Sequence, residues 1–237
     1  MIKYSIIIPA FNEEAGIKGY LSSLTKFFGV KFPEYEIIVV DDGSLDRTGK
    51  EVKSVKTTKI RYYKLDKNQG KGKALKYGFG KSTGQIVIFL DAGGDFPPKQ
   101  LTIFISAIEQ DGFDMAIANK WDKKSKINYS LKRIIFSKIF RKINSMLFKI
   151  NFSDTQAGLK AFSKKRIENI INKVENNGFV FDLELLILAS KSKLKIIELP
   201  VILNWKNKKR GINLKTAFTM LKQTLALRKK FAKEALN

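Results

Sequence analysis

Acidic side chains follow three apolar runs in the first half of the chain. Glu13 follows the first run, Asp41 and Asp42 end the second, and Asp91 ends the third, with Asp95 close behind. The chain has no histidine and no cysteine, so disulfides are excluded and acid, base or metal chemistry must use carboxylates. Carboxylates suit Mg²⁺ or Mn²⁺, which often also bind substrate phosphates. Because ligands of an open parallel sheet bind at the carboxyl ends of its strands, the pattern indicates a nucleotide-binding α/β enzyme.

A glycine-containing turn precedes a helical pattern at NQGKGKA, residues 68–74. Backbone N–H groups at the start of a helix form an anion-binding site. Lys71 and Lys73 add positive charge there, so the turn is a candidate for binding a diphosphate. A plain loop-to-helix cap is the alternative interpretation.

Apolar runs and helical patterns alternate through this half of the chain. The sequence predicts strands at 4–8, 36–40, 59–64 and 86–90, and helices at 13–28, 46–55 and 71–81. Nearly continuous Ile/Val runs are typical of strands that helices cover on both faces. We therefore expect an α/β fold with a mostly parallel, Rossmann-like central sheet flanked by helices.

Positive charge is concentrated in the second half of the chain. The 237 residues carry a formal net charge of +23, of which residues 1–120 contribute +4 and residues 121–237 contribute +19. Such a surface faces nucleic acid, an acidic membrane leaflet or a phosphorylated substrate, unless the lysines only solvate the surface. The sequence has no apolar run of 18 or more residues, and Met1 leads directly into a strand. We therefore expect a cytoplasmic chain without a transmembrane helix.

Five motifs in succession resemble family 2 glycosyltransferases of the GT-A fold. They are IIIPAFNEE at 6–14, VVDDGSLDRTG at 39–49, NQGKGKALKYGFGKSTG at 68–84, FLDAGGD at 89–95 and DTQAGLKAF at 154–162. The chain looks most like dolichyl-phosphate glucosyltransferases and the neighbouring dolichyl-phosphate mannose synthases, from about residue 3 to about residue 230. DTQAGLK followed by FVFDLELL at 179–186 is more specific than the N-terminal motifs, and ELPV at 198–201 with Trp205 looks like the glucosyltransferase branch.

The resemblance implies a donor site for a nucleotide-activated hexose, with UDP-glucose favoured and GDP-mannose next. Pro9, Phe11 and Glu13, together with Val40 and Asp42, would hold the nucleobase and ribose. Asp91 would lie beside the sugar diphosphate and its metal. The donor site expected from these motifs also includes Ala10, Asp41, Lys73, Leu90 and Ala92.

One position departs from the family pattern. The family usually carries Asp-x-Asp where this chain has Asp91-Ala92-Gly93. In an extended segment, side chains two residues apart share a face, so Asp95 can present a carboxylate on the side of the missing one. Asp91 with Asp95 is therefore the preferred metal pair, for Mg²⁺ or Mn²⁺. The alternatives are a metal bound by Asp91 and the diphosphate alone, or a chain that has lost transferase activity.

The implied acceptor is a polyprenyl phosphate such as dolichyl phosphate. Its phosphate is largely ionised at neutral pH and can attack the anomeric carbon with inversion, without an enzymic base. Asp91 is a catalytic candidate beside the departing diphosphate. Arg133, Lys160, Arg210 and Lys215 are candidate phosphate clamps, with solvated surface cations as the alternative.

Two basic amphipathic helices are predicted at 131–150 and 214–236. Such helices can lie on an acidic leaflet, or pack their apolar faces on the sheet. We expect peripheral attachment to the inner face of the cell membrane, or a membrane protein partner. The predicted organisation is a GT-A domain over 1–211, with a nucleotide-sugar half at 1–120 and an acceptor-side half at 121–211, followed by a C-terminal helix at 212–237.

Three other functions compete with this interpretation. A nucleic-acid-binding protein would explain the charge but not the motifs, and no known nucleic-acid motif is present, so we expect no nucleic acid partner. A family 2 transferase with a soluble or polysaccharide acceptor is the second. An inactive GT-A binding module, suggested by Gly93, is the third.

Overall fold

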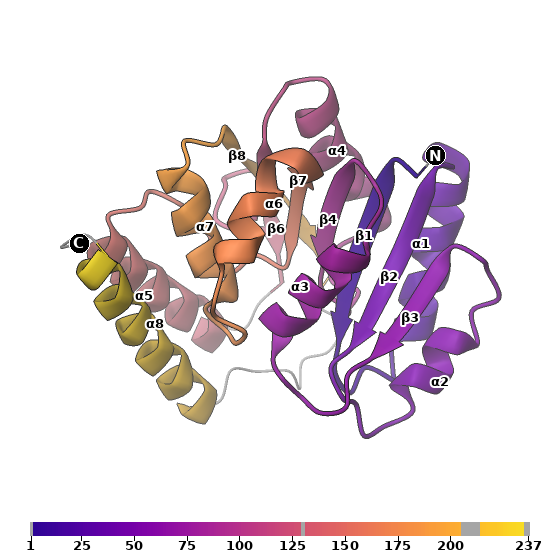
Figure 1. Cartoon of the computed structure of the whole chain (residues 1–237), viewed down its shortest axis with the longest axis horizontal. Coiled ribbons are helices and arrows are strands. Elements are labelled where there is room, and N and C mark those ends of the chain that lie inside the picture. The colour runs from indigo at the N-terminus through magenta and orange to yellow at the C-terminus, as the bar shows by residue number, and fades with distance from the viewer. Residues whose placement is uncertain (1, 129–130, 205–213, 235–237) are drawn as a thin grey trace.

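Seven strands form one mostly parallel sheet in the computed structural model, which describes residues 2–128, 131–204 and 214–234 (Figure 1). The order across the sheet is β3-β2-β1-β4-β7-β5-β8, and β7 runs antiparallel to both β4 and β5. The strands are β1 Tyr4–Ala10, β2 Tyr35–Asp41, β3 Ile60–Lys64, β4 Ile86–Leu90, β5 Met115–Asn119, β7 Leu159–Ser163 and β8 Ile196–Pro200. A separate short parallel pair consists of β6 Lys126–Ile127 and β9 Ile202–Leu203.

Helices cover both faces of the sheet (Figure 1). One face packs against α1 Ile17–Lys31, α2 Thr48–Lys53 and α4 Leu101–Glu109, which the short 3₁₀ turn Pro98–Gln100 precedes. The other face packs against α3 Lys71–Lys81, α6 Lys164–Lys173 and α7 Phe181–Lys191. Two further helices are α5 Leu131–Phe148 and α8 Leu214–Glu234.

Alternate strand residues enter two different hydrophobic cores. Ile6 and Ile8 of β1 pack in the core that contains α1, whereas Ile7 packs in the core that contains α3. All three side chains are fully buried. Two covered faces explain why the strands are continuous apolar runs, as the sequence indicated. The seven predicted elements are all present, although α1 begins at Ile17 because residues 13–16 form a turn.

The reversed strand β7 brings two distant segments together. Leu90 at the end of β4 pairs with Leu159 at the start of β7. The backbone N–H of Asp91 then donates a hydrogen bond to the carbonyl oxygen of Gly158, at 2.9 Å. The DTQAGLK motif therefore enters the sheet beside Asp91, at the edge where the parallel strands end.

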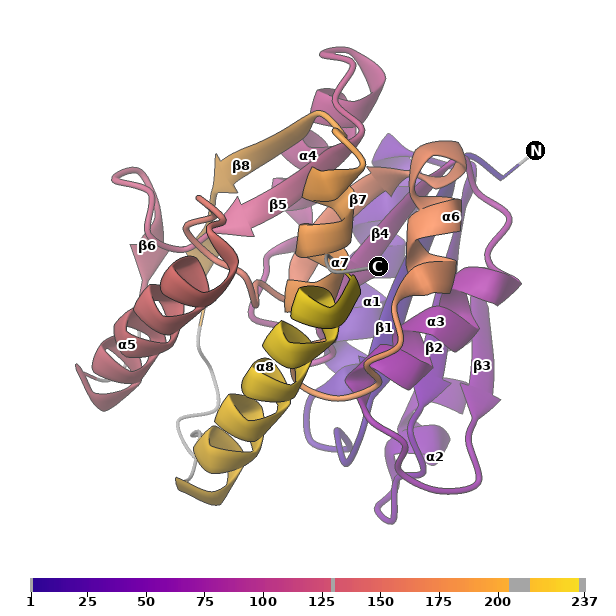
Figure 2. The ribbon, with the colours of Figure 1, turned by 60° about the vertical axis from the view of Figure 1, so that its left-hand side comes forward.

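Helices α5 and α8 lie side by side away from the sheet (Figures 1 and 2). Leu227 and Phe231 of α8 are buried in a small apolar cluster with Val180, Leu183 and Ile187 on or beside α7. The predicted alternative, that the apolar faces of α5 and α8 pack directly on the sheet, therefore does not describe α8.

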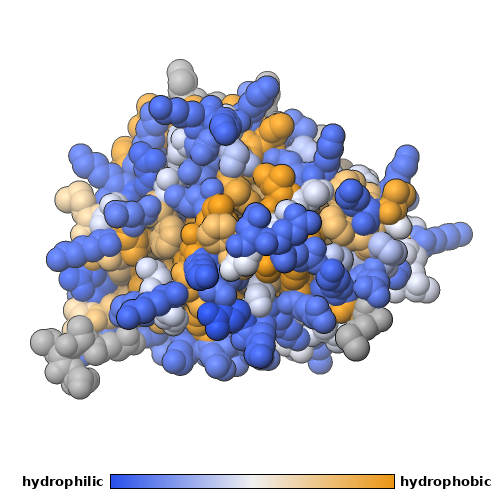
Figure 3. Space-filling model, turned by 90° about the horizontal axis from the view of Figure 1, so that it is seen from above, coloured by the Kyte–Doolittle hydropathy of each residue, from blue (hydrophilic) through white to orange (hydrophobic). Residues whose placement is uncertain are grey.

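The face opposite the carboxyl ends of β1, β2 and β3 carries many hydrophilic side chains, with hydrophobic residues visible between them (Figure 3). Among the described residues, none of the helices combines the length and the apolar character needed to cross a bilayer.

Candidate functional site

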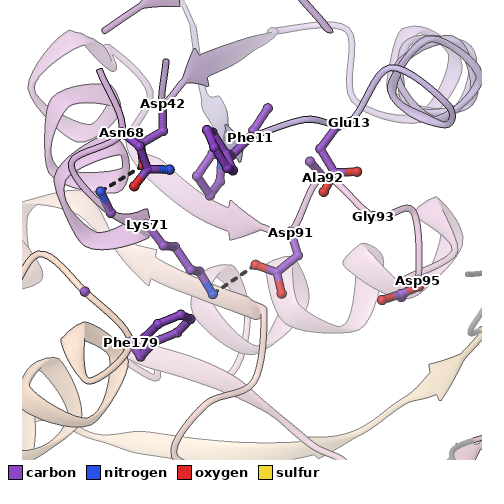
Figure 4. A pocket seen from close by; sticks show the side chains of 14 residues that line it. Phe11, Glu13, Asp42, Asn68, Lys71, Asp91, Ala92, Gly93, Asp95 and Phe179 are labelled. Carbon is purple, nitrogen blue, oxygen red and sulfur yellow. Dashed lines mark hydrogen bonds and ion pairs between the residues drawn. The ribbon is translucent and has the colours of Figure 1, made fainter. Parts of the chain in front are cut away.

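A cleft of about 430 Å³ opens at the carboxyl ends of β1, β2 and β4 (Figure 4). The loop after β1 forms one wall, the turn at the start of α3 forms a second, and the loop after β4 crosses between them. The lining residues are Pro9, Ala10, Phe11, Glu13, Asp42, Asn68, Gly70, Lys71, Asp91, Ala92, Gly93, Asp95, Gly178 and Phe179. Its position is the usual ligand site of an open α/β sheet.

Asp91 and Lys71 form an ion pair across this cleft. The Lys71 Nζ atom lies 2.9 Å from Oδ1 of Asp91, whose side chain is 41% exposed (Figure 4). Behind Asp91, the buried Tyr20 hydroxyl donates to the carbonyl oxygen of Phe96 at 2.8 Å. Burial raises the pKa of Tyr20 well above its usual value, and the charges of Asp91 and Asp95 add to this. The cleft thus contains two carboxylates near a hydroxyl that stays neutral.

Lys71 also contacts a second, buried carboxylate. Its Nζ lies 3.2 Å from Oδ2 of Asp182, and the other oxygen of Asp182 lies 2.7 Å from Nζ of Lys160. Lys160 in β7 is only 1% exposed, and its ammonium also donates to the carbonyl of Ala157. Charges therefore alternate along a continuous row from Asp91 through Lys71 and Asp182 to Lys160.

The pKa shifts in this row follow from burial and neighbouring charge. Desolvation opposes the charged form of Lys71, but Asp182 and Asp91 outweigh it and raise the pKa of Lys71. Burial would raise the pKa of Asp182, but Lys160 and Lys71 lower it. Burial lowers the pKa of Lys160 despite its contact with Asp182. Asp182 is therefore ionised at neutral pH, and Lys71 carries its positive charge into the cleft.

Asp42 shapes the turn that the sequence assigned to diphosphate binding. Its two carboxylate oxygens accept the backbone N–H groups of Gln69 and Gly70, each at 2.8 Å. Gly70 has a φ of +98°, which favours glycine. The neighbouring Asp41 is fully buried and accepts hydrogen bonds from the backbone N–H of Ser44 and the Tyr62 hydroxyl. Asp41 thus fixes the loop after β2 and does not line the cleft.

Most of the predicted donor residues meet at the cleft. Those that line it are Pro9, Ala10, Phe11, Glu13, Asp42, Asp91, Ala92 and Asp95. Four others do not line it: Val40 and Leu90 are buried in strands, Asp41 is buried beneath its loop, and Lys73 in α3 is half-buried outside the lining. Two residues apart on a helix lie about 200° apart around its axis, so Lys71 and Lys73 cannot both face the cleft.

The predicted phosphate clamps have different positions. The structure does not support a clamp at Lys160, because its ammonium is buried and bonded to Asp182 and Ala157. Arg133 belongs to α5 and Lys215 to α8, but their side chains lie outside the described residues, as do Arg210 and Trp205.

Sequence reasoning missed several lining residues and the charge row behind them. The cleft also contains Asn68, Gly178 and Phe179, and Lys71 rather than Lys73 faces Asp91. Asn68 and Lys71 belong to the turn motif, which was a signal for them. Asp182 had a weaker signal, since it lies in a motif but is brought to Lys71 only by the fold.

Comparison with known proteins assigns the family. The sequence model described as glycosyl transferase family 2 matches residues 5–171. The chain belongs to glycosyl transferase family 2.

Relatives of this family 2 glycosyltransferase include an uncharacterized protein of Methanocaldococcus jannaschii, 32% identical over 222 residues, or 91% of this chain and 88% of the relative. The dolichyl-phosphate beta-glucosyltransferase of Dictyostelium discoideum is 31% identical, over 86% of this chain and 66% of the relative. The enzyme of the same name from Saccharomyces cerevisiae is 29% identical, over 83% and 65%. The chain thus spans slightly less than two thirds of these two enzymes.

Solved structures show that this family 2 chain has the GT-A fold. Glucosyl-3-phosphoglycerate synthase from Mycobacterium tuberculosis superposes with a TM-score of 0.74 at 20% identity, covering 96% of this chain and 80% of that one. That structure contains Mn²⁺, UDP and glucosyl-3-phosphoglycerate. At this level of identity the likeness concerns the fold.

The carboxylates of the cleft fit a divalent cation that is also coordinated by the oxygens of a bound diphosphate. Within the described part of the chain, no group of three or more acidic side chains could enclose a metal alone. Asp91 and Asp95 line the same cleft, and an ammonium already lies against Asp91. Two carboxylates at a strand end match the preference of Mg²⁺ or Mn²⁺ for a few protein oxygens completed by phosphates and water.

A second, smaller cavity of this glycosyltransferase lies between α5, α8 and the loop that precedes β7. Lys120, Ser137 and Arg141 line it, with the Arg141 guanidinium stacked 5.7 Å from the centre of the Trp121 ring. Lys120 Nζ lies 3.0 Å from Oδ2 of Asp154 in the DTQAGLK motif. This cavity therefore combines two cations and a hydroxyl.

Proposed function

We propose that this chain is an inverting hexosyltransferase that moves glucose, with mannose next in preference, from a nucleotide sugar to a polyprenyl phosphate at the inner face of a membrane. UDP-glucose is the favoured donor and GDP-mannose the next. The observation that carries the proposal is the cleft at the sheet edge, where Asp91 and Lys71 meet.

The cleft has the groups that a nucleoside diphosphate sugar requires. Phe11 and Asp42 lie at the end where the base and ribose would bind (Figure 4). The turn held by Asp42 leads from there toward Lys71, although the N–H groups of Gln69 and Gly70 are already bonded to Asp42. The group at this wall that can stabilise a phosphate is therefore the Lys71 ammonium. Asp91 lies across from Lys71, beside the position for the diphosphate and the anomeric carbon.

The acceptor assignment rests on the relatives and on α5 and α8. Two relatives are named as dolichyl-phosphate beta-glucosyltransferases. Apolar side chains project from both helices: Ile135 and Ile139 on α5 are 57% and 54% exposed, and Phe218 and Leu225 on α8 are 70% and 46% exposed. These lie on helices rich in lysine and arginine, a combination that binds the surface of an acidic leaflet.

The reaction needs charge control rather than a base. An oxygen of the acceptor phosphate attacks the anomeric carbon, the bond from that carbon to the diphosphate oxygen breaks, and the nucleoside diphosphate leaves with the electron pair. The acceptor oxygen is already deprotonated, so no enzymic group takes a proton. A bound Mg²⁺ or Mn²⁺ would neutralise the departing diphosphate. Lys71 stabilises the same charge from the other wall, and Asp91 and Asp95 would hold the cation.

Acceptor binding is assigned in this proposal to residues from Lys120 onward. Lys120 and Arg141 in the smaller cavity supply cations near Ser137, and Arg133, Arg210 and Lys215 are further candidates from the sequence. Holding the phosphate in line with the anomeric carbon would provide a large part of the rate enhancement.

The test is transfer of labelled sugar from a panel of UDP- and GDP-hexoses to polyprenyl phosphate in acidic liposomes, with Mg²⁺, Mn²⁺ or a chelator. Chelator-sensitive transfer from one donor is expected, and Asp91→Ala should abolish it. Asp95→Ala should change the metal dependence. Asp114→Asn, which alters a carboxylate ion-paired to Arg166 outside the cleft, is the control. Absence of transfer by a folded, liposome-bound protein would refute the proposal, and transfer only to soluble glycans would reassign the acceptor.

A further inference from the structure

We propose that Lys160 and Asp182 are positioning residues that together fix both charged partners of the donor cleft, Lys71 and Asp91. This inference deepens the proposed function and rests on it, because it concerns how the same cleft binds a diphosphate. Neither Lys160 nor Asp182 lines the cleft.

The first connection runs through side chains. Lys160 Nζ lies 2.7 Å from one oxygen of Asp182, and the other oxygen lies 3.2 Å from Lys71 Nζ. Lys71 in turn contacts Asp91 at 2.9 Å. Asp182 is 4% exposed, so it has no solvent to compete for its oxygens. It therefore holds the ammonium of Lys71 at one place on the cleft wall.

The second connection runs through the backbone. The Lys160 ammonium donates to the carbonyl of Ala157, the residue before Gly158. Gly158 accepts the backbone N–H of Asp91 at 2.9 Å, and its Cα packs directly against the Asp91 carboxylate. Lys160 thus fixes the bend that supports Asp91. Both connections begin at one buried ammonium and end at one catalytic carboxylate.

A buried ion pair of this kind is not required to stabilise the fold. Removing two charges from water is costly, and an apolar pair of similar volume is often at least as stable. By contrast, the pair between Asp114 and Arg166 has one solvated partner, because the arginine side chain is 58% exposed although Asp114 is buried. A buried pair that links two cleft residues is instead suited to pre-organising a charged site.

The arrangement also explains how Lys71 serves two partners. In the free cleft its ammonium lies between Asp91 and Asp182. A bound diphosphate brings new negative charge to the same space, and Asp182 remains as the anchor that keeps Lys71 beside it. Without Asp182, Asp91 is the one carboxylate left beside the Lys71 ammonium within the described part of the chain, and the position of Lys71 would depend on that residue.

The experiment compares binding of UDP and uridine by calorimetry, with and without Mn²⁺, for the wild type and for Lys71→Met, Asp182→Asn and the double variant. Loss of a charged hydrogen bond predicts about 10- to 100-fold weaker UDP binding for Lys71→Met, with uridine unchanged. Asp182→Asn should weaken the binding of UDP about tenfold. In the Lys71→Met background it should have no further effect, because Asp182 acts through Lys71.

Two further variants separate positioning from folding. Lys160→Met/Asp182→Asn removes both buried charges and should fold, yet bind UDP at least as weakly as Asp182→Asn, because the support of Asp91 by Lys160 is also lost. Asp114→Asn should bind UDP like the wild type. Unchanged UDP affinity in the folded Lys160→Met/Asp182→Asn protein would overturn the inference, as would an equal Asp182→Asn effect with and without Lys71. Failure of the wild type to bind either UDP or GDP would instead overturn the proposed function.

Discussion

Gly158→Ala tests the close contact between β7 and Asp91. A Cβ at this position would lie 2.9 Å from Oδ1 of Asp91 and nearer still to Oδ2 and Cγ, whereas ordinary contact begins near 3.4 Å. The backbone cannot separate easily, because Asp91 N–H is bonded to the Gly158 carbonyl at 2.9 Å. The Asp91 side chain must therefore rotate away, which breaks its ion pair with Lys71.

Gly158→Ala should affect stability through overpacking and activity through displacement of the Asp91 carboxylate. Forcing a methyl group into a packed site typically destabilises by about 1–3 kcal/mol, which for a domain of this size lowers the melting temperature by about 2–4 °C per kcal/mol. Displacing a reacting group by about 1 Å lowers activity about 100-fold. Gly158→Ala should therefore reduce both the melting temperature and kcat/KM for sugar transfer.

A double-mutant cycle identifies the cause. In an Asp91→Ala background the carboxylate is gone, so adding the Gly158 methyl group should destabilise by less than about 0.5 kcal/mol. Gly80→Ala is the matched control, because a Cβ there meets nothing within 4 Å. Equal destabilisation by Gly158→Ala with and without the Asp91 carboxylate, measured by denaturant unfolding, would refute this account of the contact.

Three other substitutions test different parts of the chain. Glu36→Gln should destabilise by about 2–4 kcal/mol in thermal unfolding, because Glu36 is a buried carboxylate with four hydrogen bonds. Burial would raise the pKa of Glu36, but these bonds lower it, so its contribution is present above the unfolded pKa of about 4.3 and lost as pH falls through the folded pKa. Asp42→Asn should weaken UDP binding about tenfold, since an amide cannot accept two backbone N–H groups equally well. Lys230→Met should destabilise by about 1–3 kcal/mol, because Glu184 is 1% exposed and loses its cation, whereas the exposed Lys229→Met should not.

Each of these has a clear contrary result. Unfolding of Glu36→Gln that follows the wild-type curve between pH 3 and pH 7 would remove Glu36 from the acid transition. UDP affinity unchanged in Asp42→Asn would separate the turn from the diphosphate site. Equal stability of the Lys230 and Lys229 variants would show that the Glu184 contact does not fix α8.

The helices and strands of the first half of the chain could be predicted from the sequence, because each has a strong local pattern. Strands covered on both faces, such as β2, are continuous apolar runs, and α3 begins at the residue expected from its glycine turn. The reversed direction of β7 had no such signal. Leu159–Ser163 is a short buried run whose pattern is the same for parallel and antiparallel pairing, and only its neighbours decide the direction.

The sequence predicted the site residues that directly follow a strand. It could not predict those whose position depends on packing between distant elements. Asp91 and Asp42 could be placed because they end strands at one edge of the sheet. The sequence could not show whether Lys71 or Lys73 faces the cleft, because that depends on how α3 is rotated about its axis. Lys160 looked like a clamp because lysine in a motif suggests a ligand. Its burial against Asp182 arises from a contact between β7 and α7 that no local pattern encodes.

The reversed strand also makes the stretch from 120 to 158 a closed insert. The chain leaves the sheet at the end of β5 and returns at the start of β7, both at the Asp91 edge. The ion pair between Lys120 and Asp154 joins the two stems at 3.0 Å. The insert is still joined to later parts of the chain, because its strand β6 pairs with β9 and its helix α5 lies beside α8. A change in the length of this insert would therefore also alter the contacts of β9 and α8.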